Sequence, residues 1–307
     1  MKSLLLHPSN WKDYSLIDSG DGKKLERFGN FLFSRPEPQA LWSPRLSLKE
    51  WEKSSGVFLS SSNSLNDDST GKWSLKKHLP LRWEMKFENI KFFATPTPFR
   101  HLGFFPDQSP HWLWASKKIK SSIKYSDKPF SPKLLNLFGY SGLASLHAAY
   151  HGASVTHVDA SKKAINYAFE NRNLSSFQHL PIKFITDDAM KFVKREIRRQ
   201  NKYDAIILDP PKYGRGPNGE KWNIETDLQN LLQLVEKLLS KDALFVVLTC
   251  YAIRSSHISL YNALSYALRN HKGELSSGEL ALKENGHSQR KQEDIFWHEE
   301  ELVYNIE

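Results

Sequence analysis

The hydrophobic pattern of the chain changes near residue 132. Before this point, short apolar segments such as residues 27–33 are separated by prolines, as within residues 36–44, which is typical of short strands joined by irregular connections. Beyond it, short apolar runs alternate with amphipathic stretches, which indicates strands alternating with helices. We therefore predict a smaller β-rich domain over residues 1–95 and an α/β domain over residues 96–307.

The pattern of the second domain is regular enough to assign its elements one by one. Strands are predicted at residues 133–137, 154–158, 182–186, 203–208 and 243–249, and closing strands in the last stretch, including residues 301–306. Helices are predicted at residues 143–150, 161–173, 189–199, 225–239 and 256–269. Because repeated strand–helix units form parallel sheets with right-handed crossovers, the predicted fold class is α/β, with a doubly wound, seven-stranded, mostly parallel sheet.

Two segments of the first domain have distinct patterns. Residues 83–93 alternate between apolar and polar side chains and predict strands, whereas residues 54–70 are rich in Ser, Asn and Asp and predict a mobile loop. Seven of the nine tryptophans lie within the first 114 residues. Because tryptophan is usually largely buried, we expect most of them to pack a small core, with a few available to stack on nucleic-acid bases.

Composition narrows the class of protein. Apolar residues make up 39% of the chain and charged residues 25%, which is ordinary for a soluble globular protein. The leucine run at residues 4–6 is too short for a signal peptide, and no apolar stretch approaches the length of a membrane span. The single cysteine, Cys250, excludes an intramolecular disulfide. These observations favour a cytoplasmic protein.

Basic residues are concentrated before residue 133. Residues 1–95 contain 15 Lys and Arg against 11 Asp and Glu, residues 96–132 contain 6 against 2, and residues 133–307 contain 22 against 21. The net charge of +9 favours a polyanionic partner such as RNA, because neutralising phosphates releases condensed counterions. The alternative is that the charge only aids solubility.

Candidate ligand contacts follow the predicted strands, where ligands bind in such sheets. Residues 136–142 read Asn-Leu-Phe-Gly-Tyr-Ser-Gly, in which Gly139 and Gly142 permit a tight turn and close approach of a ligand. This spacing differs from the Gly-x-Gly-x-x-Gly of dinucleotide-binding enzymes. Asp159 follows the second strand, where a carboxylate accepts hydrogen bonds from the ribose hydroxyls of an adenosine. Asp188 follows the third strand, where it serves as a helix cap, as a contact to an adenine amino group, or as both.

The segment at residues 209–213, Asp-Pro-Pro-Lys-Tyr, directly follows the apolar strand at residues 203–208. Two consecutive prolines have no backbone N–H groups and stiffen the loop. The Asp209 carboxylate and the neighbouring carbonyl groups are therefore held toward an incoming planar base. This arrangement suits a methyltransferase that acts on a nitrogenous base.

These motifs together resemble those of class I S-adenosylmethionine-dependent methyltransferases. Over residues 99–256 the chain is similar to the bacterial group that contains the 23S rRNA cytosine-C5 methyltransferases, whose fourth motif also reads Asp-Pro-Pro-Lys-aromatic. The N-terminal region does not match the complete small RNA-binding barrel often fused to that group. The resemblance implies S-adenosylmethionine as cofactor and a base of ribosomal RNA, most directly cytosine C5, as the methyl acceptor.

The resemblance also implies a set of cofactor contacts. The stretch at residues 99–108 is expected to close over the cofactor, with Gln108 in contact. The methionine moiety would be flanked by Asn136, Phe138 and Gly139, the ribose by Asp159 and the adenine by Asp188, with Gly142 and Asp209 completing the set. No metal site is predicted.

Cys250 carries a further expectation. It lies in Thr249-Cys250-Tyr251, where the family reads Ser-Cys-Ser or Thr-Cys-Ser. The resemblance implies that its thiolate adds to cytosine C6, which makes C5 nucleophilic, while Asp209 hydrogen-bonds the N3/N4 edge. Lys212 would promote ionisation of this thiol, whose ordinary pKa is about 8.5. The alternative is a structural, buried Cys250 and direct methylation of a base nitrogen at the Asp-Pro-Pro segment.

Other interpretations stay open. Lys212, Arg215 and Lys221 lie among glycines and predict a flexible basic loop, which either clamps a phosphate backbone or is merely solvated. The same fold also suits a methyltransferase of proteins or small molecules, a nicotinamide-dependent oxidoreductase, or an RNA-binding relative without activity. The oligomeric state is open, with a homodimer as one alternative.

Overall fold

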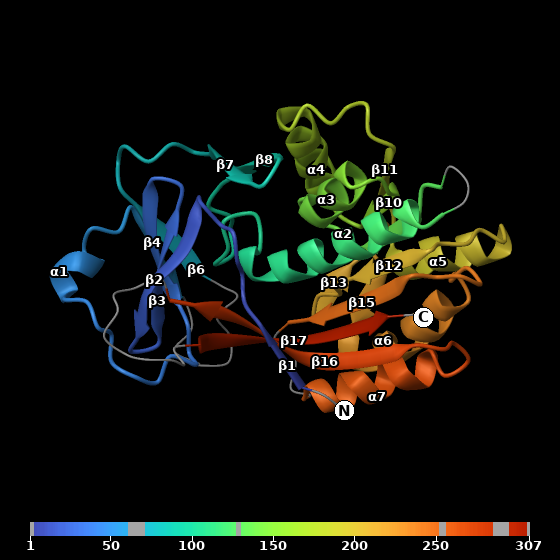
Figure 1. Cartoon of the computed structure of the whole chain (residues 1–307). Helices are drawn as coiled ribbons and strands as arrows, with labels where there is room; N and C mark the ends of the chain where they lie inside the picture. Colours follow the sequence, from blue (N-terminus) through green and yellow to red (C-terminus); the bar gives the residue numbers. More distant parts are fainter. Residues whose placement is uncertain (1–2, 61–70, 127–129, 252–255, 285–294, 306–307) are drawn as a thin grey trace. The chain divides into compact units, whose positions relative to one another are not determined.

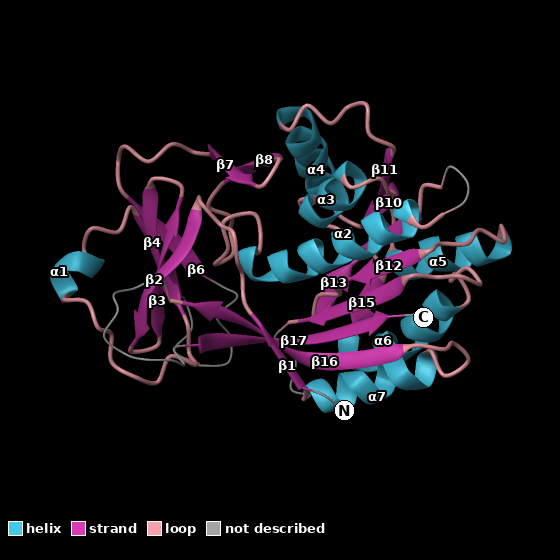
Figure 2. Cartoon of the chain, viewed as in Figure 1, coloured by secondary structure: helices cyan, strands magenta, loops and turns pink. Residues whose placement is uncertain are grey.

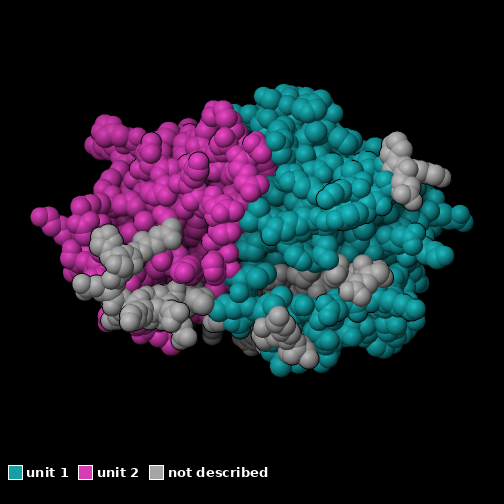
Figure 3. Space-filling view, viewed as in Figure 1, with its two compact units in different colours: residues 1–6, 110–280, 299–307 teal, residues 7–109, 281–298 magenta. Residues whose placement is uncertain are grey.

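The structure, a computed structural model, describes residues 3–60, 71–126, 130–251, 256–284 and 295–305. The chain forms two compact units (Figure 3). Unit 1 comprises Met1–Leu6, Pro110–Leu280 and Glu299–Glu307, and unit 2 comprises His7–Ser109 and Ala281–His298. The observed division thus differs from the predicted boundary at residue 95, because both ends of the chain contribute strands to unit 1 and the long central segment of that unit begins only at Pro110.

Unit 1 is built around an eight-stranded sheet (Figure 1). Its strands in spatial order are β1 (Ser3–Leu6), β16 (Glu274–Lys283), β17 (Ile295–Asn305), β15 (Phe245–Cys250), β12 (Ala205–Leu208), β9 (Lys133–Leu137), β10 (Ser154–Asp159) and β11 (Ile182–Thr186). The five strands from β15 to β11 run parallel, and β17 is antiparallel to β15. The predicted α/β class is confirmed. The sheet has eight strands rather than seven, since β1 pairs in parallel with β16.

Helices cover both faces of this sheet (Figure 2). They are α2 (Ser109–Lys124), α3 (Leu143–Tyr150), α4 (Lys162–Leu174), α5 (Ala189–Arg198), α6 (Ile224–Glu236) and α7 (His257–Ala267). Successive strand residues point to opposite faces. Leu134 and Val247 therefore pack in a cluster with residues of α2 and α3, whereas Leu135 and Val246 pack in a cluster with residues of α5, α6 and α7. Because both faces are buried, the central strands are almost entirely apolar. None of the helices within the described residues is long and apolar enough to cross a bilayer.

Most predicted elements of unit 1 are confirmed to within a few residues. The strands at residues 133–137 and 182–186 and the helix at residues 143–150 have the predicted bounds. Helix α2 was not predicted. Its buried residues Trp112, Ala115 and Ile119 are spaced as one helical face, but lysines and serines occupy much of the rest of the segment and obscure the period.

Unit 2 consists of a five-stranded sheet and a two-stranded ribbon. The sheet runs in the order β2 (Tyr14–Gly20), β3 (Lys23–Phe28), β4 (Phe31–Pro36), β5 (Gly56–Ser60) and β6 (Gly71–Leu75), and the ribbon pairs β7 (Trp83–Phe87) with β8 (Ile90–Ala94). Helix α1 (Leu48–Trp51) and the 3-10 helix η1 (Pro106–Gln108) complete the unit. The strands predicted within residues 83–93 are confirmed. The predicted loop at residues 54–70 instead begins with strand β5, and residues 61–70 lie outside the described residues.

Aromatic and ion-paired side chains form the interior of unit 2. Phe33 stacks on Trp83 with ring centroids 5.4 Å apart. The buried Glu26 carboxylate accepts a hydrogen bond from Arg35 Nε at 2.6 Å and one from the Tyr14 hydroxyl at 2.9 Å. The expected tryptophan-containing core is therefore present, and a buried ion pair adds to it.

Candidate active site

The carboxyl ends of four parallel strands lie side by side in unit 1. Leu208 of β12 pairs with Leu137 of β9 and with Leu248 of β15, and Leu137 pairs in turn with Val158 of β10. The residues that follow these partners form one row along the sheet edge: Thr249, Asp209, Phe138 and Asp159. Three of the predicted site residues are thus brought together at the edge where ligands bind in parallel sheets.

The loop after β9 is a tight turn with three residues in the left-handed region. The φ angle is +58° at Phe138, +47° at Tyr140 and +83° at Gly142. The Gly139 N–H donates to the Val158 carbonyl at 3.0 Å, and the Gly142 N–H donates to the Gly139 carbonyl at 3.1 Å. The predicted tight turn is confirmed, and it is anchored on β10 as well as on β9.

The two glycines of this loop leave room for protein atoms beneath it. A Cβ at Gly139 would lie 2.3 Å from Cε1 of His157, and a Cβ at Gly142 would lie 2.7 Å from Cβ of Ala168. Both separations are far shorter than van der Waals contact. Packing inside the unit therefore already requires glycine at both positions, before any ligand is considered.

A buried chain of hydrogen bonds supports the loop from below. Asn136 Nδ2 donates to Ser145 Oγ at 2.9 Å, and the same oxygen lies 2.9 Å from His157 Nδ1. Burial lowers the pKa of His157 to about 3, so the ring is neutral at physiological pH. The Asn136 side chain, predicted to flank the methionine moiety, thus bonds inward to Ser145. The role of His157 was missed, because a histidine inside an apolar strand carries no motif.

Asp159 holds the loop with both of its carboxylate oxygens. Oδ2 accepts from the Tyr140 N–H at 2.9 Å, and Oδ1 accepts from the Ser161 N–H at 2.8 Å. Burial raises the pKa of Asp159, and these two N–H groups oppose the rise. A carboxylate offers about four acceptor positions. Asp159 therefore keeps acceptor capacity toward a ligand after bonding its own loop.

Asp188 caps helix α5. Its Oδ1 accepts from the Lys191 N–H at 2.9 Å, which confirms the predicted capping role. The preceding Asp187 pairs with Arg195 at 2.6 Å between Oδ2 and Nη1, and its N–H donates to the Asp159 carbonyl at 3.1 Å. The two aspartates after β11 are therefore fixed close to the Asp159 backbone.

A tryptophan joins the Asp-Pro-Pro segment to the glycine loop. Trp222 Nε1 donates to the Pro211 carbonyl at 2.6 Å, and its ring centroid lies 5.2 Å from that of Phe138. The Asp209 N–H donates to the Leu137 carbonyl at 3.4 Å. Trp222 is only 6% exposed. In the sequence, Trp222 stands out only as a bulky aromatic residue within an otherwise polar segment. That feature is too weak to assign it a role.

The predicted flexible basic loop is instead a β-hairpin. Strand β13 (Tyr213–Arg215) pairs antiparallel with β14 (Lys221–Asn223). The Lys212 ammonium lies 5.6 Å from the centroid of the Tyr213 ring, which is 62% exposed. Ladder hydrogen bonds and the buried Trp222 hold the hairpin in place, and these long-range contacts outweigh its glycine-rich composition.

The end of β15 presents two residues to opposite faces. The Cys250 side chain is 1% exposed and packs in the core cluster with Leu260 and Leu264 of α7. The Thr249 side chain belongs to the other face, where its Oγ1 lies 3.4 Å from Nδ1 of the buried His111 on α2. The thiol is therefore inside the core. His111 is a buried polar group near the site edge that the sequence did not reveal.

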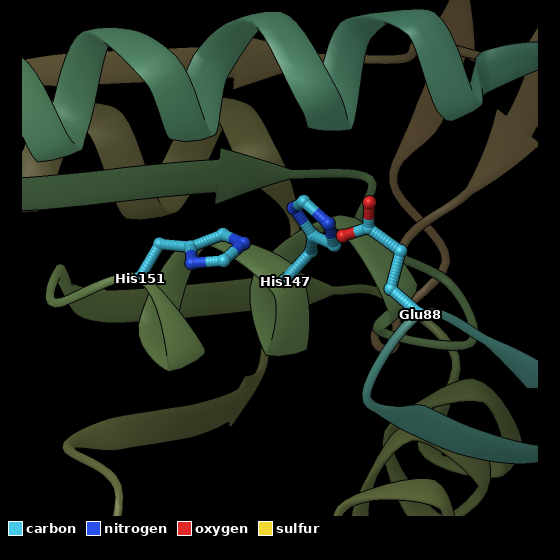
Figure 4. Close-up of side chains that lie close together, drawn as sticks. All are labelled: Glu88, His147 and His151. Atoms are coloured by element: carbon cyan, nitrogen blue, oxygen red, sulfur yellow. The ribbon is translucent and has the colours of Figure 1, made fainter. Parts of the chain in front are cut away.

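The structure also places Gln108, which was predicted to contact the cofactor, and two neighbouring histidines. Gln108 ends η1 in unit 2, and α2 begins at the next residue. His147 of α3 and His151, which caps the carboxyl end of that helix, have ring centroids 4.7 Å apart (Figure 4). His147 Nδ1 lies 2.6 Å from Ser116 Oγ of α2. This buried contact links α2 to α3.

Comparisons with known proteins agree with this geometry. A family model described as Conserved hypothetical protein 95 matches residues 124–264. The ribosomal RNA large subunit methyltransferase K/L of Shewanella frigidimarina is 38% identical over 116 residues, which make up 37% of this chain. A Methanocaldococcus jannaschii protein described as a candidate ribosomal RNA large subunit methyltransferase is 34% identical over 136 residues. The chain spans only 16% of the Shewanella relative and 31% of the Methanocaldococcus relative.

Two solved structures extend the comparison to the whole chain. A Streptococcus mutans protein described as a candidate SAM-dependent methyltransferase has a TM-score of 0.69 at 15% identity, over 96% of this chain and 76% of that one, which shows a shared fold. The SAM-dependent methyltransferase from Agrobacterium tumefaciens has a TM-score of 0.91 and 39% identity, over 99% of this chain and 94% of that one. Because this likeness spans both units and all of the edge described above, the chain belongs to the family of S-adenosylmethionine-dependent methyltransferases.

Proposed function

We propose that this protein transfers a methyl group from S-adenosylmethionine to a base of large-subunit ribosomal RNA. The observation that carries the proposal is the row at the sheet edge, in which Asp159 and Asp209 flank the glycine loop. The names of the curated relatives support ribosomal RNA as the acceptor, and the net charge of +9 is suited to a polyanion.

The cofactor side of the row suits an adenosine and its methionine group. Asp159 would accept hydrogen bonds from the ribose hydroxyls with the acceptor capacity that its loop bonds leave. Asp188 would contact the adenine while it caps α5. The backbone of Phe138, Gly139 and Gly142 would face the methionine moiety, and Asn136 would support that backbone from below. Gln108 stays a proposed contact.

The acceptor side of the row suits a base that carries an amino group. The Asp209 carboxylate and the carbonyl groups next to it are hydrogen-bond acceptors, and the two prolines contribute no N–H to compete with them. Such acceptors orient an amino group so that its lone pair, or that of a ring nitrogen, faces the methyl donor. Lys212 lies next to this segment and would favour negative charge nearby.

The atom that receives the methyl group is the finer part of the proposal. Methylation of cytosine C5 requires a thiolate at C6, and Cys250 is the only cysteine of the chain. Cys250 is nevertheless 1% exposed and lies in the core cluster that also contains residues of α7. This burial favours the second candidate, direct methylation of a base nitrogen at Asp209, which needs no covalent intermediate.

The test is transfer of tritium from methyl-labelled S-adenosylmethionine to large-subunit ribosomal RNA transcribed without modifications. Wild type is compared with Cys250→Ala and Cys250→Ser, with cofactor binding by calorimetry as the check on folding. Labelled N-methyl nucleosides that survive both substitutions would support the nitrogen route. Labelled 5-methylcytidine that disappears in both variants would support the covalent route. Absence of label in RNA from wild type that binds the cofactor would overturn RNA as the acceptor.

A further inference from the structure

The hairpin after the Asp-Pro-Pro segment places two cations directly opposite each other. Arg215 of β13 pairs with Lys221 of β14, and Tyr213 pairs with Asn223. Because side chains alternate along a strand, these four share one face of the hairpin, while Trp222 occupies the other. Directly opposite residues have Cβ atoms about 4.5–5.5 Å apart. The exposed face therefore places the stems of two positively charged side chains close enough together for both to reach one phosphate group.

These charges have no acidic partner within the hairpin. Among the residues that the structure describes, no carboxylate forms an ion pair with Arg215 or Lys221. The nearest acid in sequence, Glu220, pairs with Lys191 and accepts a hydrogen bond from the Asn218 N–H at 2.9 Å. Directly opposed like charges destabilise a ribbon. Without a bound anion, the two side chains therefore repel each other, and an anion that bridges them would relieve this repulsion.

The hairpin is fixed relative to the methyl-transfer site. The Ile224 N–H donates to the Lys212 carbonyl at 3.0 Å, and Asn223 Oδ1 accepts from the Glu225 N–H at 3.0 Å at the start of α6. Trp222 adds its bond to Pro211 on the buried face. The cationic face is therefore held beside Asp209 by backbone and core contacts, and an anion bound there would keep a constant distance from the reacting base.

We propose that Arg215 and Lys221 form a clamp for a backbone phosphate of the RNA, on the same strand as the base presented to Asp209. This inference rests on the proposed function, since it takes RNA to be the methyl acceptor. The guanidinium donates two parallel hydrogen bonds to phosphate oxygens, and the ammonium adds a point charge from across the hairpin. The clamp positions the strand and carries no base specificity.

The experiment compares wild type with the double variant Arg215→Gln and Lys221→Gln. Affinity for a single-stranded fragment of the RNA is measured by fluorescence anisotropy at salt concentrations from about 50 to 200 mM. The logarithm of the association constant is expected to fall linearly with the logarithm of the salt concentration, with a slope of about 0.7 for each phosphate contact. Loss of this one phosphate contact is expected to make the slope less steep by about 0.7. The KM for RNA rises, while the rate at saturating RNA and the affinity for S-adenosylmethionine stay near wild type.

Two control variants distinguish the effect of the charges on the hairpin from the effect of the total charge of the protein. The double variant Lys237→Gln and Lys241→Gln removes the same charge from exposed residues between α6 and β15, at the amino end of that strand, and is expected to keep the wild-type slope. The exchange Arg215→Lys with Lys221→Arg keeps both charges and is also expected to keep the slope.

Each result bears on the clamp. A wild-type slope and KM in the glutamine double variant would overturn it, even if the wild type methylates RNA. A wild type that binds RNA with the clamp-dependent slope but transfers no methyl group would retain the clamp and reject the proposed function. A wild type that neither binds nor methylates RNA would overturn both.

Discussion

The two halves of the sheet edge are built in opposite ways. The cofactor half, residues 136–142 with Asp159, is supported by buried polar side chains that bond one another, as in the chain from Asn136 through Ser145 to His157. The acceptor half, residues 209–223, is anchored by the buried Trp222, and its exposed side chains include Tyr213, Arg215 and Lys221.

Under the proposed function, the cofactor half is complete within the protein, whereas the acceptor half is completed by the bound RNA. In the cofactor half, each loop bond ends on another group of the same unit, so the loop geometry is set before any ligand binds. In the acceptor half, the like charges of Arg215 and Lys221 face each other across a ladder. A preorganised site is suited to a small cofactor that is the same in every reaction. A site whose charges are neutralised by the substrate is suited to a large polyanion.

The largest expected effect comes from exchanging one carboxylate at a time. Asp209→Asn removes the proposed charged acceptor of the base, and we expect the rate of methyl transfer to fall on the order of 10²–10³-fold, as when one preorganised polar group of a site is lost.

Asp159→Asn is the reciprocal variant. It should instead raise the Kd for S-adenosylmethionine by about 10–100-fold, because hydrogen bonds to a charged group contribute about 1.5–3 kcal/mol. Single-turnover kinetics and calorimetry measure the two effects. If both variants lost cofactor affinity equally, the division into two halves would be wrong.

A glycine in each half provides the next comparison. Gly139→Ala would force a Cβ to 2.3 Å from Cε1 of His157, whereas a Cβ at Gly214 would meet its nearest atom, Cγ of Pro211, at 3.5 Å. We expect Gly139→Ala to lower the free energy of unfolding by about 1–3 kcal/mol, as overpacking does. Gly214→Ala should change it by about 0.5 kcal/mol or less. Urea denaturation of both variants checks this, and equal stabilities would show that the cofactor loop yields to the added methyl group.

The smallest effect is a pH dependence of the cofactor half. The folded protein keeps His157 neutral down to about pH 3, whereas the unfolded chain takes up the proton below a pKa of about 6.5. The unfolded state therefore binds more protons in this window, and the stability that the neutral ring contributes is lost as the pH falls. Replacement by His157→Gln should make the decline of stability below pH 6.5 shallower, by an amount that approaches about 1.4 kcal/mol per pH unit near pH 5.

The control for this prediction lies in unit 2. Burial also lowers the pKa of His101 to about 3, and that residue is unchanged in the variant. A residual decline should therefore persist in His157→Gln. Parallel curves for wild type and variant, measured by urea denaturation at several pH values, would contradict the assigned burial of His157.

Much of the fold was predictable because its periods are local. The central strands read as apolar runs, and the turns and caps after them, such as Gly142 and Asp188, lie within a few residues of the elements they bound. Three residues of the row, Phe138, Asp159 and Asp209, followed from the same reasoning, since each lies at the end of a parallel strand or directly after it. The hairpin was not predictable, because its short strands contain glycine and charged residues and depend on Trp222 packing against Phe138.

The sequence by itself determined the α/β class, the alternation of central strands and helices from residue 133 onward and the polar residues at the strand ends, because burial on two faces leaves a readable pattern in each short segment. Only the tertiary structure decided that β1 pairs with β16, that the position of His157 requires glycine at Gly139 and that Cys250 lies in the core cluster shared with α7. Each of these contacts depends on which segment, distant in the sequence, packs at that position. The physical reason is that local periodicity records whether a residue is buried, whereas its partner is selected by the packing of all elements at once.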